Sequence, residues 1–169
     1  AKVMQEGTLP EEINNDWHIG SRVARIDVGE KVLGTGKYPD DFYLDGMLYG
    51  SALRSKYPRA RVLSIDKTKA LALPGVEAVV TAEDIPGENK IGHLKHDQYT
   101  LIPIGGLTHY LGDAICLIAA ESQEILERAK ALIQVEYEVL EPVLDPFAAM
   151  QEDAPKIHPG MQPEGNVLA

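Results

Sequence analysis

A change of hydrophobic period between residues 122 and 139 constrains the fold of this chain more than any other feature. After Ser122, apolar residues recur at helical spacing, at Ile125, Ala129, Leu132 and Ile133. From residue 134 onward, apolar residues alternate with polar ones, at Val135, Tyr137 and Val139. The first pattern predicts a helix capped by Ser122 with one apolar stripe, and the second predicts a strand with one buried and one wet face. A helix followed at once by such a strand requires a sheet against which both can pack.

The remaining apolar runs complete an α+β pattern. We expect two strands at 49–55 and 60–66, joined as a hairpin through Pro58, because proline suits a turn and lacks a ladder donor. Asp66 precedes a second helix over 67–73, and Thr81 precedes a single helical turn. Further strands are expected at 76–80, 101–104 and 114–120, the last covered on both faces, and a helical turn near 147–150. Because strand–helix–strand alternation does not continue, the prediction is a mixed or antiparallel sheet with two main helices.

The 169 residues suit one domain with tails. Residues 1–20 have no clear period and are interpreted as an N-terminal arm. Residues 21–150 carry the predicted strands and helices. Residues 151–169 are interspersed with proline and glycine, as in an extended linker.

Charge and hydropathy exclude two classes of partner. The formal net charge is −10, and residues 68–169 hold the whole excess, with 16 acidic and 6 basic side chains. Such a surface repels phosphate backbones, so nucleic acid is not expected as a partner. No apolar run is long enough to span a membrane, and a cytoplasmic protein is expected. The one basic cluster surrounds the predicted hairpin tip and is expected to be solvated: Arg54, Lys56, Arg59 and Arg61.

No motif in the chain predicts chemistry. Glycines at 34 and 36 lack the spacing of a phosphate loop, and the acidic run at 40–46 lacks two ligands of a calcium loop. His93 and His96 offer too few converging ligands for zinc. The single cysteine, Cys116, excludes a disulfide framework and a four-thiolate metal site, and it lies in an apolar run that favours burial. We therefore expect no catalytic, cofactor-binding or metal-binding residue.

The order and spacing of short motifs over residues 19–150 resemble a known domain. The motifs lie at 19–27, 46–49, 53–55, 58–62, 64–66, 74–76, 78–81, 84–86, 110–112 and 135–138. Together they are similar to the α/β-hammerhead domain that opens the molybdenum-binding large subunit of the xanthine dehydrogenase and aldehyde oxidase family. Two positions depart from the family pattern, and both bear on the subfamily: Arg59 stands where histidine is common, and Asp113-Ala114 stand where Gln or Glu is followed by proline.

This resemblance implies a non-catalytic scaffold domain within a molybdenum hydroxylase. In such enzymes a pterin-bound molybdenum (molybdopterin) hydroxylates an aldehyde or N-heterocycle, and electrons leave through two [2Fe–2S] clusters, often to FAD. The pterin loops and the glutamate base belong to later domains, so the chain alone is expected to be inactive. The implied partners are the molybdopterin-binding domains of the same subunit, an iron–sulfur domain or subunit, and an FAD subunit.

Two arginines are the candidate inter-domain contacts. Arg22 and Arg25 lie near an arm with too few apolar residues to bury itself, so charge-assisted hydrogen bonds to neighbouring domains would hold it. The alternative is that they pair with nearby acids such as Asp27. At the level of the whole chain, the alternative function is a stand-alone binding or adaptor module, and the reading frame beyond residue 169 distinguishes the two.

Overall fold

The computed structural model describes residues 19–20, 25–93, 95–158 and 166–167, which belong to two compact units, Ala1–Asp45 and Gly46–Ala169. In the first unit, helix α2 spans Val28–Leu33 and the 3-10 turn η1 spans Pro39–Asp41. Gly34 ends α2 in the left-handed region at φ 72°, where glycine meets no Cβ penalty. No helix in the described part of the chain is long and apolar enough to cross a membrane.

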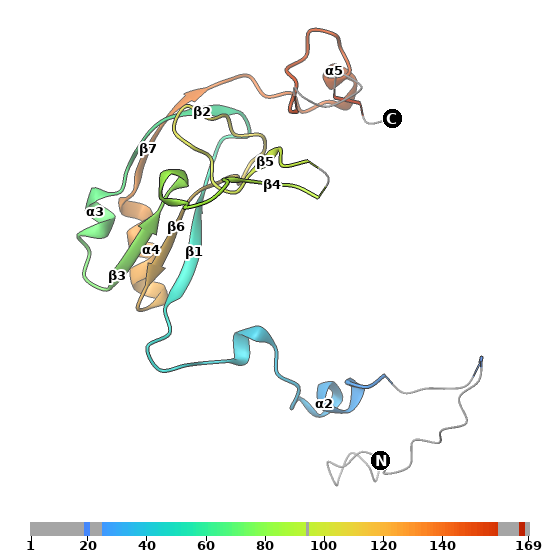
Figure 1. Cartoon of the computed structure of the whole chain (residues 1–169), viewed down its shortest axis with the longest axis vertical. Coiled ribbons are helices and arrows are strands. Elements are labelled where there is room, and N and C mark those ends of the chain that lie inside the picture. The colour runs from blue at the N-terminus through green and yellow to red at the C-terminus, as the bar shows by residue number, and fades with distance from the viewer. Residues whose placement is uncertain (1–18, 21–24, 94, 159–165, 168–169) are drawn as a thin grey trace. The chain divides into compact units, whose positions relative to one another are not determined.

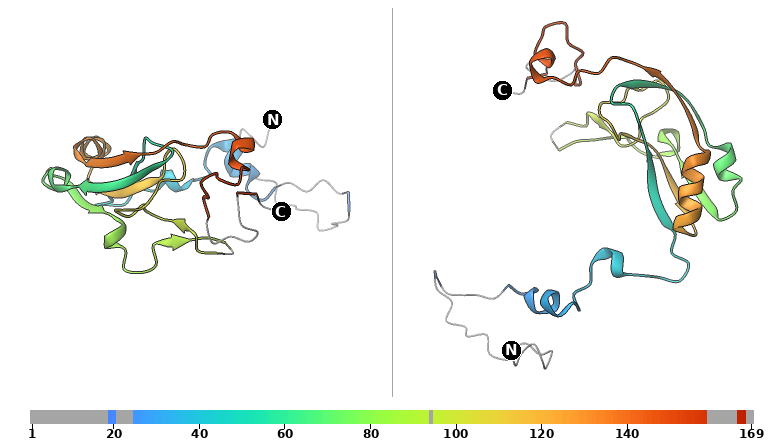
Figure 2. Two further views of the ribbon diagram at one scale, coloured as in Figure 1. Left: turned by 90° about the horizontal axis from the view of Figure 1, so that it is seen from above. Right: turned by 180° about the vertical axis from the view of Figure 1, so that it is seen from behind.

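The second unit is built on a three-stranded antiparallel sheet in the order β1–β6–β3 (Figure 1). These strands are Tyr49–Arg54, Ala114–Ala120 and Val76–Val80, which confirms three predicted strands to within one residue. Helix α4, Gln123–Leu132, covers one face, lying behind the sheet in Figure 1 and in front of it in the rear view of Figure 2. The opposite face is open at Leu117, which is 44% exposed, so the expectation that this strand is covered on both faces fails there.

The predicted hairpin is wrong, although both of its strands exist. Strand β2, Ala60–Asp66, pairs antiparallel with β7, Gln134–Val139, while β1 pairs with β6. The Ser55 hydroxyl bonds the backbone of Tyr57, and the buried Ala60 donates its N–H to the Thr108 hydroxyl at 2.9 Å. These bonds direct the chain after β1 away from that strand. Strands β1 and β2 therefore belong to different sheets, and each pairs with a strand far along the sequence.

The main core lies between α4 and the covered face of the sheet. Ser122 caps α4 as predicted, accepting the Ile125 N–H at 3.3 Å. The predicted stripe faces this core: Ala129 and Ile133 are buried, and the partly buried Ile125 and Leu132 pack against it. Leu126, which the stripe did not include, is also buried, at 1% exposed. Ala129 is fully buried as expected. The apolar spacing did not mark Leu126 as part of this face, because it follows Ile125 by one residue, about 100° around the helix.

A second, smaller core joins the two sheets. Val62, Ile102 and Ile115 are buried there, and Tyr137 packs against them with its ring 5.2 Å from that of Tyr57. Val139, predicted to be buried, is 56% exposed because it lies at the end of β7.

The strand predicted at 101–104 is absent. Leu101 and Ile102 are buried without one, since the Asn89 side chain both donates to and accepts from the backbone of Leu101. The nearby two-stranded sheet is formed by β4, Lys90–Ile91, and β5, Gln98–Tyr99.

Short helical turns complete the α+β fold. Asp66 accepts the Thr68 N–H at 2.9 Å at the start of α3, Thr68–Leu71. The turn η2, Ala82–Asp84, begins after Thr81 as predicted, and α5, Pro146–Ala149, begins after Asp145. All named strand pairs in the described residues are antiparallel.

The buried position of Leu126 predicts a large effect of truncation. Leu126→Ala should lower the free energy of unfolding by about 3 kcal/mol, through lost burial and the cavity left behind. Leu71→Ala, at a site that is 46% exposed, should cost about 1 kcal/mol or less. Urea denaturation followed by circular dichroism measures both. Equal effects of the two substitutions would show that α4 does not pack as described.

Asp84 predicts an acid-sensitive stability. The Lys67 ammonium, 2.7 Å away, and the Thr81 backbone and hydroxyl hold the pKa of this carboxyl well below its ordinary value of 3.8. A depressed pKa contributes stability that is fully present above about pH 4 and is lost as pH falls further. Asp84→Asn should lower the urea midpoint at pH 7 and flatten its fall between about pH 4 and 2. The exposed neighbour Glu83→Gln is the control, and equal acid slopes for wild type and Asp84→Asn would refute the assignment.

Candidate functional site

The basic cluster of the sequence consists of structural arginines. Arg54 donates to the Gly112 carbonyl at 2.9 Å and Arg59 to the Glu141 carbonyl at 2.8 Å. Arg61 donates to the Gly105 carbonyl at 2.9 Å and pairs with Glu138 at 3.3 Å. Each guanidinium therefore fastens one distant loop or strand end to the segment 54–61, and the cluster is not the tip of a hairpin.

Asp113 is the described carboxylate with the least exposed side chain, and sequence analysis did not identify a role for it. It is 4% exposed and accepts the backbone N–H groups of His109 and Tyr110 at 2.6 and 3.3 Å. Its own carbonyl accepts the Ser55 N–H at 2.7 Å. Asp113 thereby closes the turn that leads into β6. An aspartate directly after a turn glycine, at the start of an apolar run, was the available sequence signal.

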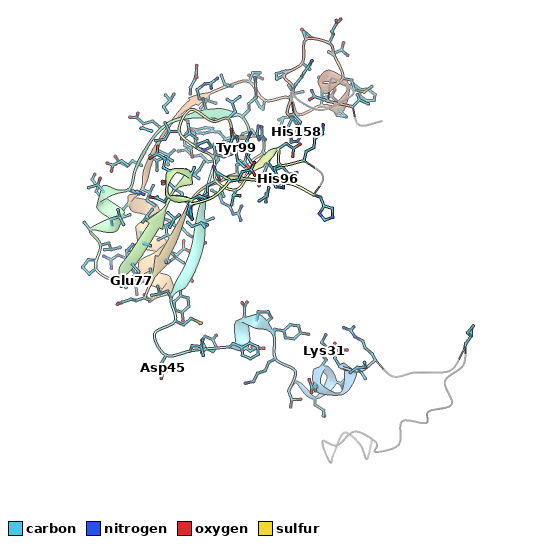
Figure 3. All side chains as sticks on the ribbon, viewed as in Figure 1. Lys31, Asp45, Glu77, His96, Tyr99 and His158 are labelled. Atoms are coloured by element: carbon cyan, nitrogen blue, oxygen red, sulfur yellow. The ribbon has the colours of Figure 1, made fainter. Side chains whose placement is uncertain are left out.

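Two of the described histidines lie beside carboxylates. His96 lies 3.0 Å from Glu88, and His158 lies 3.2 Å from Asp97. Figure 3 labels His96 and His158, which come from segments far apart in the sequence. The ring centroids of His109 and His158 are 6.3 Å apart. Within the described ranges, no group of three or more His, Cys, Asp or Glu side chains could hold a metal ion.

The candidate glycine and acidic motifs also have local roles. The Thr35 and Gly36 N–H groups bond the Glu30 carbonyl, so this glycine pair forms the end of α2. Asp41 accepts the Tyr38 N–H at 2.8 Å and closes η1. Neither motif presents a site for phosphate or calcium.

Of the two predicted inter-domain arginines, the structure describes only Arg25. Arg22 lies outside the described residues. Arg25 donates to Asp27 at 3.0 Å, and Asp27 also pairs with Lys31 at 2.6 Å. The Lys31 and Arg25 side chains hold the pKa of Asp27 below its ordinary value, with Lys31 the larger cause. The alternative contact considered for Arg25 is therefore formed in this chain, and its inter-domain role stays a prediction.

A groove of about 300 Å³ lies between the body of the second unit and the segment after β7. We call it the C-terminal groove; residues 58–59, 107–111, 142–144 and 155–157 line it with Ala149 and Asn166. Asn166 shapes its outer wall, donating to the carbonyls of Ala149 and Pro155 and accepting the Ile157 N–H at 3.1 Å. Sequence analysis did not predict these Asn166 hydrogen bonds. The segment contains several prolines and glycines, and nothing in its sequence distinguishes this asparagine as the residue that binds three backbone groups.

Comparisons with known proteins show which family of domains the chain resembles. Residues 33–141 match the family model described as "Aldehyde oxidase and xanthine dehydrogenase, a/b hammerhead domain". The chain is 45% identical over 148 residues to a probable xanthine dehydrogenase subunit of Bacillus subtilis, covering 88% of this chain and 19% of that protein. It is 38% identical over 140 residues to the nicotinate dehydrogenase large molybdopterin subunit of Eubacterium barkeri, covering 83% and 32%.

Solved structures agree with these relatives. Aldehyde oxidoreductase from Desulfovibrio gigas superposes with a TM-score of 0.76 at 31% identity, covering 83% of this chain and 17% of that one. CO dehydrogenase from Oligotropha carboxidovorans gives a TM-score of 0.72 at 36% identity, covering 80% and 17%. The chain thus spans a third or less of the length of each of these proteins.

The burial of Cys116 predicts an unreactive thiol. The side chain is fully buried in the main core, and desolvation raises its pKa to about 11. Because the thiolate is the nucleophile, the native chain should react with a disulfide reagent at pH 8 at least about 100-fold more slowly than the urea-unfolded chain. Absorbance of the released thiol measures both rates. Comparable rates would show that the core around β6 is open.

Proposed function

The chain belongs to the aldehyde oxidase and xanthine dehydrogenase a/b hammerhead domain family, and we propose that it is a non-catalytic scaffold domain of a molybdenum hydroxylase. Its relatives are large molybdenum- or molybdopterin-binding subunits of oxidoreductases. The chain covers about a fifth of the Bacillus relative, so the activity of the whole enzyme is assigned to further domains.

One observation carries the non-catalytic role. Several charged side chains of the described residues are engaged in holding backbone. Arg54 and Arg59 bind carbonyl groups, and Asp113 and Asp84 accept backbone N–H groups. Groups engaged in this way position loops and strand ends, and they are not arranged around a common reacting centre.

The cofactors of such an enzyme do not fit the residues of this chain. A [2Fe–2S] cluster needs four protein ligands, usually cysteines, and this chain has one cysteine, which is buried. The described residues also hold no cluster of three metal-binding side chains. We therefore assign the pterin-bound molybdenum, the two [2Fe–2S] clusters and any FAD to other domains or subunits, which are the proposed partners of this one.

The proposed substrate is an aldehyde or an N-heterocycle. Named relatives include xanthine, nicotinate and carbon monoxide dehydrogenases, so the family fold alone does not select among substrates. The two departures from the family pattern, Arg59 and Asp113, both bind backbone here. We therefore assign to these two residues a role in holding loops of this domain. We assign the choice of substrate to the catalytic domains. Arg22 and Arg25 remain the proposed contacts with those domains.

The proposal predicts that the 169-residue chain alone lacks the metals and the activity of the longer enzyme. The purified 169-residue chain should contain less than about 0.1 equivalent of molybdenum or iron and should hydroxylate neither xanthine nor nicotinate, because it lacks a converging ligand set. Mass spectrometric elemental analysis and a dye-reduction assay measure these quantities. Stoichiometric metal in the chain, or a coding frame that stops directly after Ala169, would contradict the proposal.

A further inference from the structure

The walls of the C-terminal groove are mainly apolar. Pro58, Leu107 and Leu111 line one side, and Val143, Leu144 and Ile157 line the other. Leu111 and Leu144 are 66% and 81% exposed, so the groove offers apolar surface that the described residues do not cover. Its volume of about 300 Å³ is at the lower end of the range for small-molecule sites.

The neutral polar groups of the groove are already bonded within the fold. The Thr108 hydroxyl donates to the Tyr57 carbonyl at 3.1 Å and accepts the Ala60 N–H at 2.9 Å. The Asn166 amide bonds three backbone groups of the outer wall. A ligand therefore meets polar partners mainly at the cationic side chains.

The charged and titratable groups that line the groove are Arg59, Lys156 and His109, with the Tyr110 phenol beside them, and none of the described lining residues is acidic. The lining is therefore locally cationic in a chain of net charge −10. Arg59 uses one N–H for the Glu141 carbonyl, and a guanidinium has five, arranged to bind a carboxylate through two of them.

We propose that the C-terminal groove binds a free small carboxylic acid whose carboxylate is carried on a compact apolar group, such as an aryl or branched alkyl chain. The carboxylate bonds Arg59, and the apolar group lies against Leu107, Leu111 and Val143. The proposed site uses only residues of the second unit and none of the cofactors of the proposed enzyme.

The probe is 4-phenylbutyrate, titrated into the ¹⁵N-labelled 169-residue chain and followed by amide NMR shifts. The shifts should concentrate at 107–111, 142–144 and 155–157. The neutral isostere 4-phenylbutan-1-ol should bind about tenfold more weakly, the size expected for one charge-assisted hydrogen bond, and 4-phenylbutylamine should not bind measurably.

Matched variants separate charge from folding. Arg59→Met keeps the apolar stem and should weaken 4-phenylbutyrate about tenfold, while binding of the alcohol stays unchanged. Arg61→Met removes an arginine that holds Gly105 and Glu138 outside the groove, and it should leave binding unchanged.

Three results would overturn the assignment. The first is equal affinity for acid and alcohol, and the second is no saturable shift at the groove with about 10 mM acid, a concentration at which even weak fragments bind. The third is that the peptide acetyl-Glu-Phe-Glu-amide binds tighter than 4-phenylbutyrate, which would identify a protein segment as the occupant. Metal content and activity of the chain have no bearing on these outcomes, so the proposed function is tested separately.

Discussion

Strand β6 is the element on which both cores depend. It is paired on both edges, by β1 and by β3, so its backbone donors and acceptors are satisfied within the sheet. Successive side chains of a strand point to opposite faces. Cys116 and Ile118 therefore enter the core beneath α4, whereas Ile115 enters the smaller core with Val62 and Ile102. A slip of one residue in its pairing would exchange these two sets, so this one register positions both sheets.

The parts of the fold that follow from local pattern were predictable from the sequence. The change from helical to alternating period gave α4 and β7, and the Ser122 cap marks where the helix begins. Strand pairing was not predictable in this way. A turn through Pro58 suggested a hairpin, but β2 pairs with β7, more than 60 residues later, because the Ala60 backbone is held by Thr108. Which strands meet depends on contacts between distant segments, and local turn chemistry does not contain that information.

The candidate sites also divide into features that local spacing predicts and features that depend on contacts between distant segments. Motif spacing argues against phosphate, calcium and zinc sites, since each requires several ligands at defined intervals. The bonds that fasten the loops could not be read from spacing. Arg59 reaches a carbonyl 82 positions away, and Asn89 binds both backbone groups of Leu101 across 12 positions. Such side-chain bonds to backbone replace regular strand pairing where the chain is irregular but buried, which is why Leu101 and Ile102 are buried without belonging to a strand.

The placement of charge follows from this way of fastening loops. Arginine is suited to bind carbonyl groups because it stays charged and offers several donors from one planar group. Three arginines gathered between residues 54 and 61 bind carbonyls of three separate segments, so positive charge concentrates at the end of the second unit where those segments meet. Acidic side chains are also present there, since Arg61 pairs with Glu138. Of these arginines, Arg59 both holds the segment after β7 and lines the C-terminal groove, so the positive charge of the groove is in part a consequence of how that segment is held.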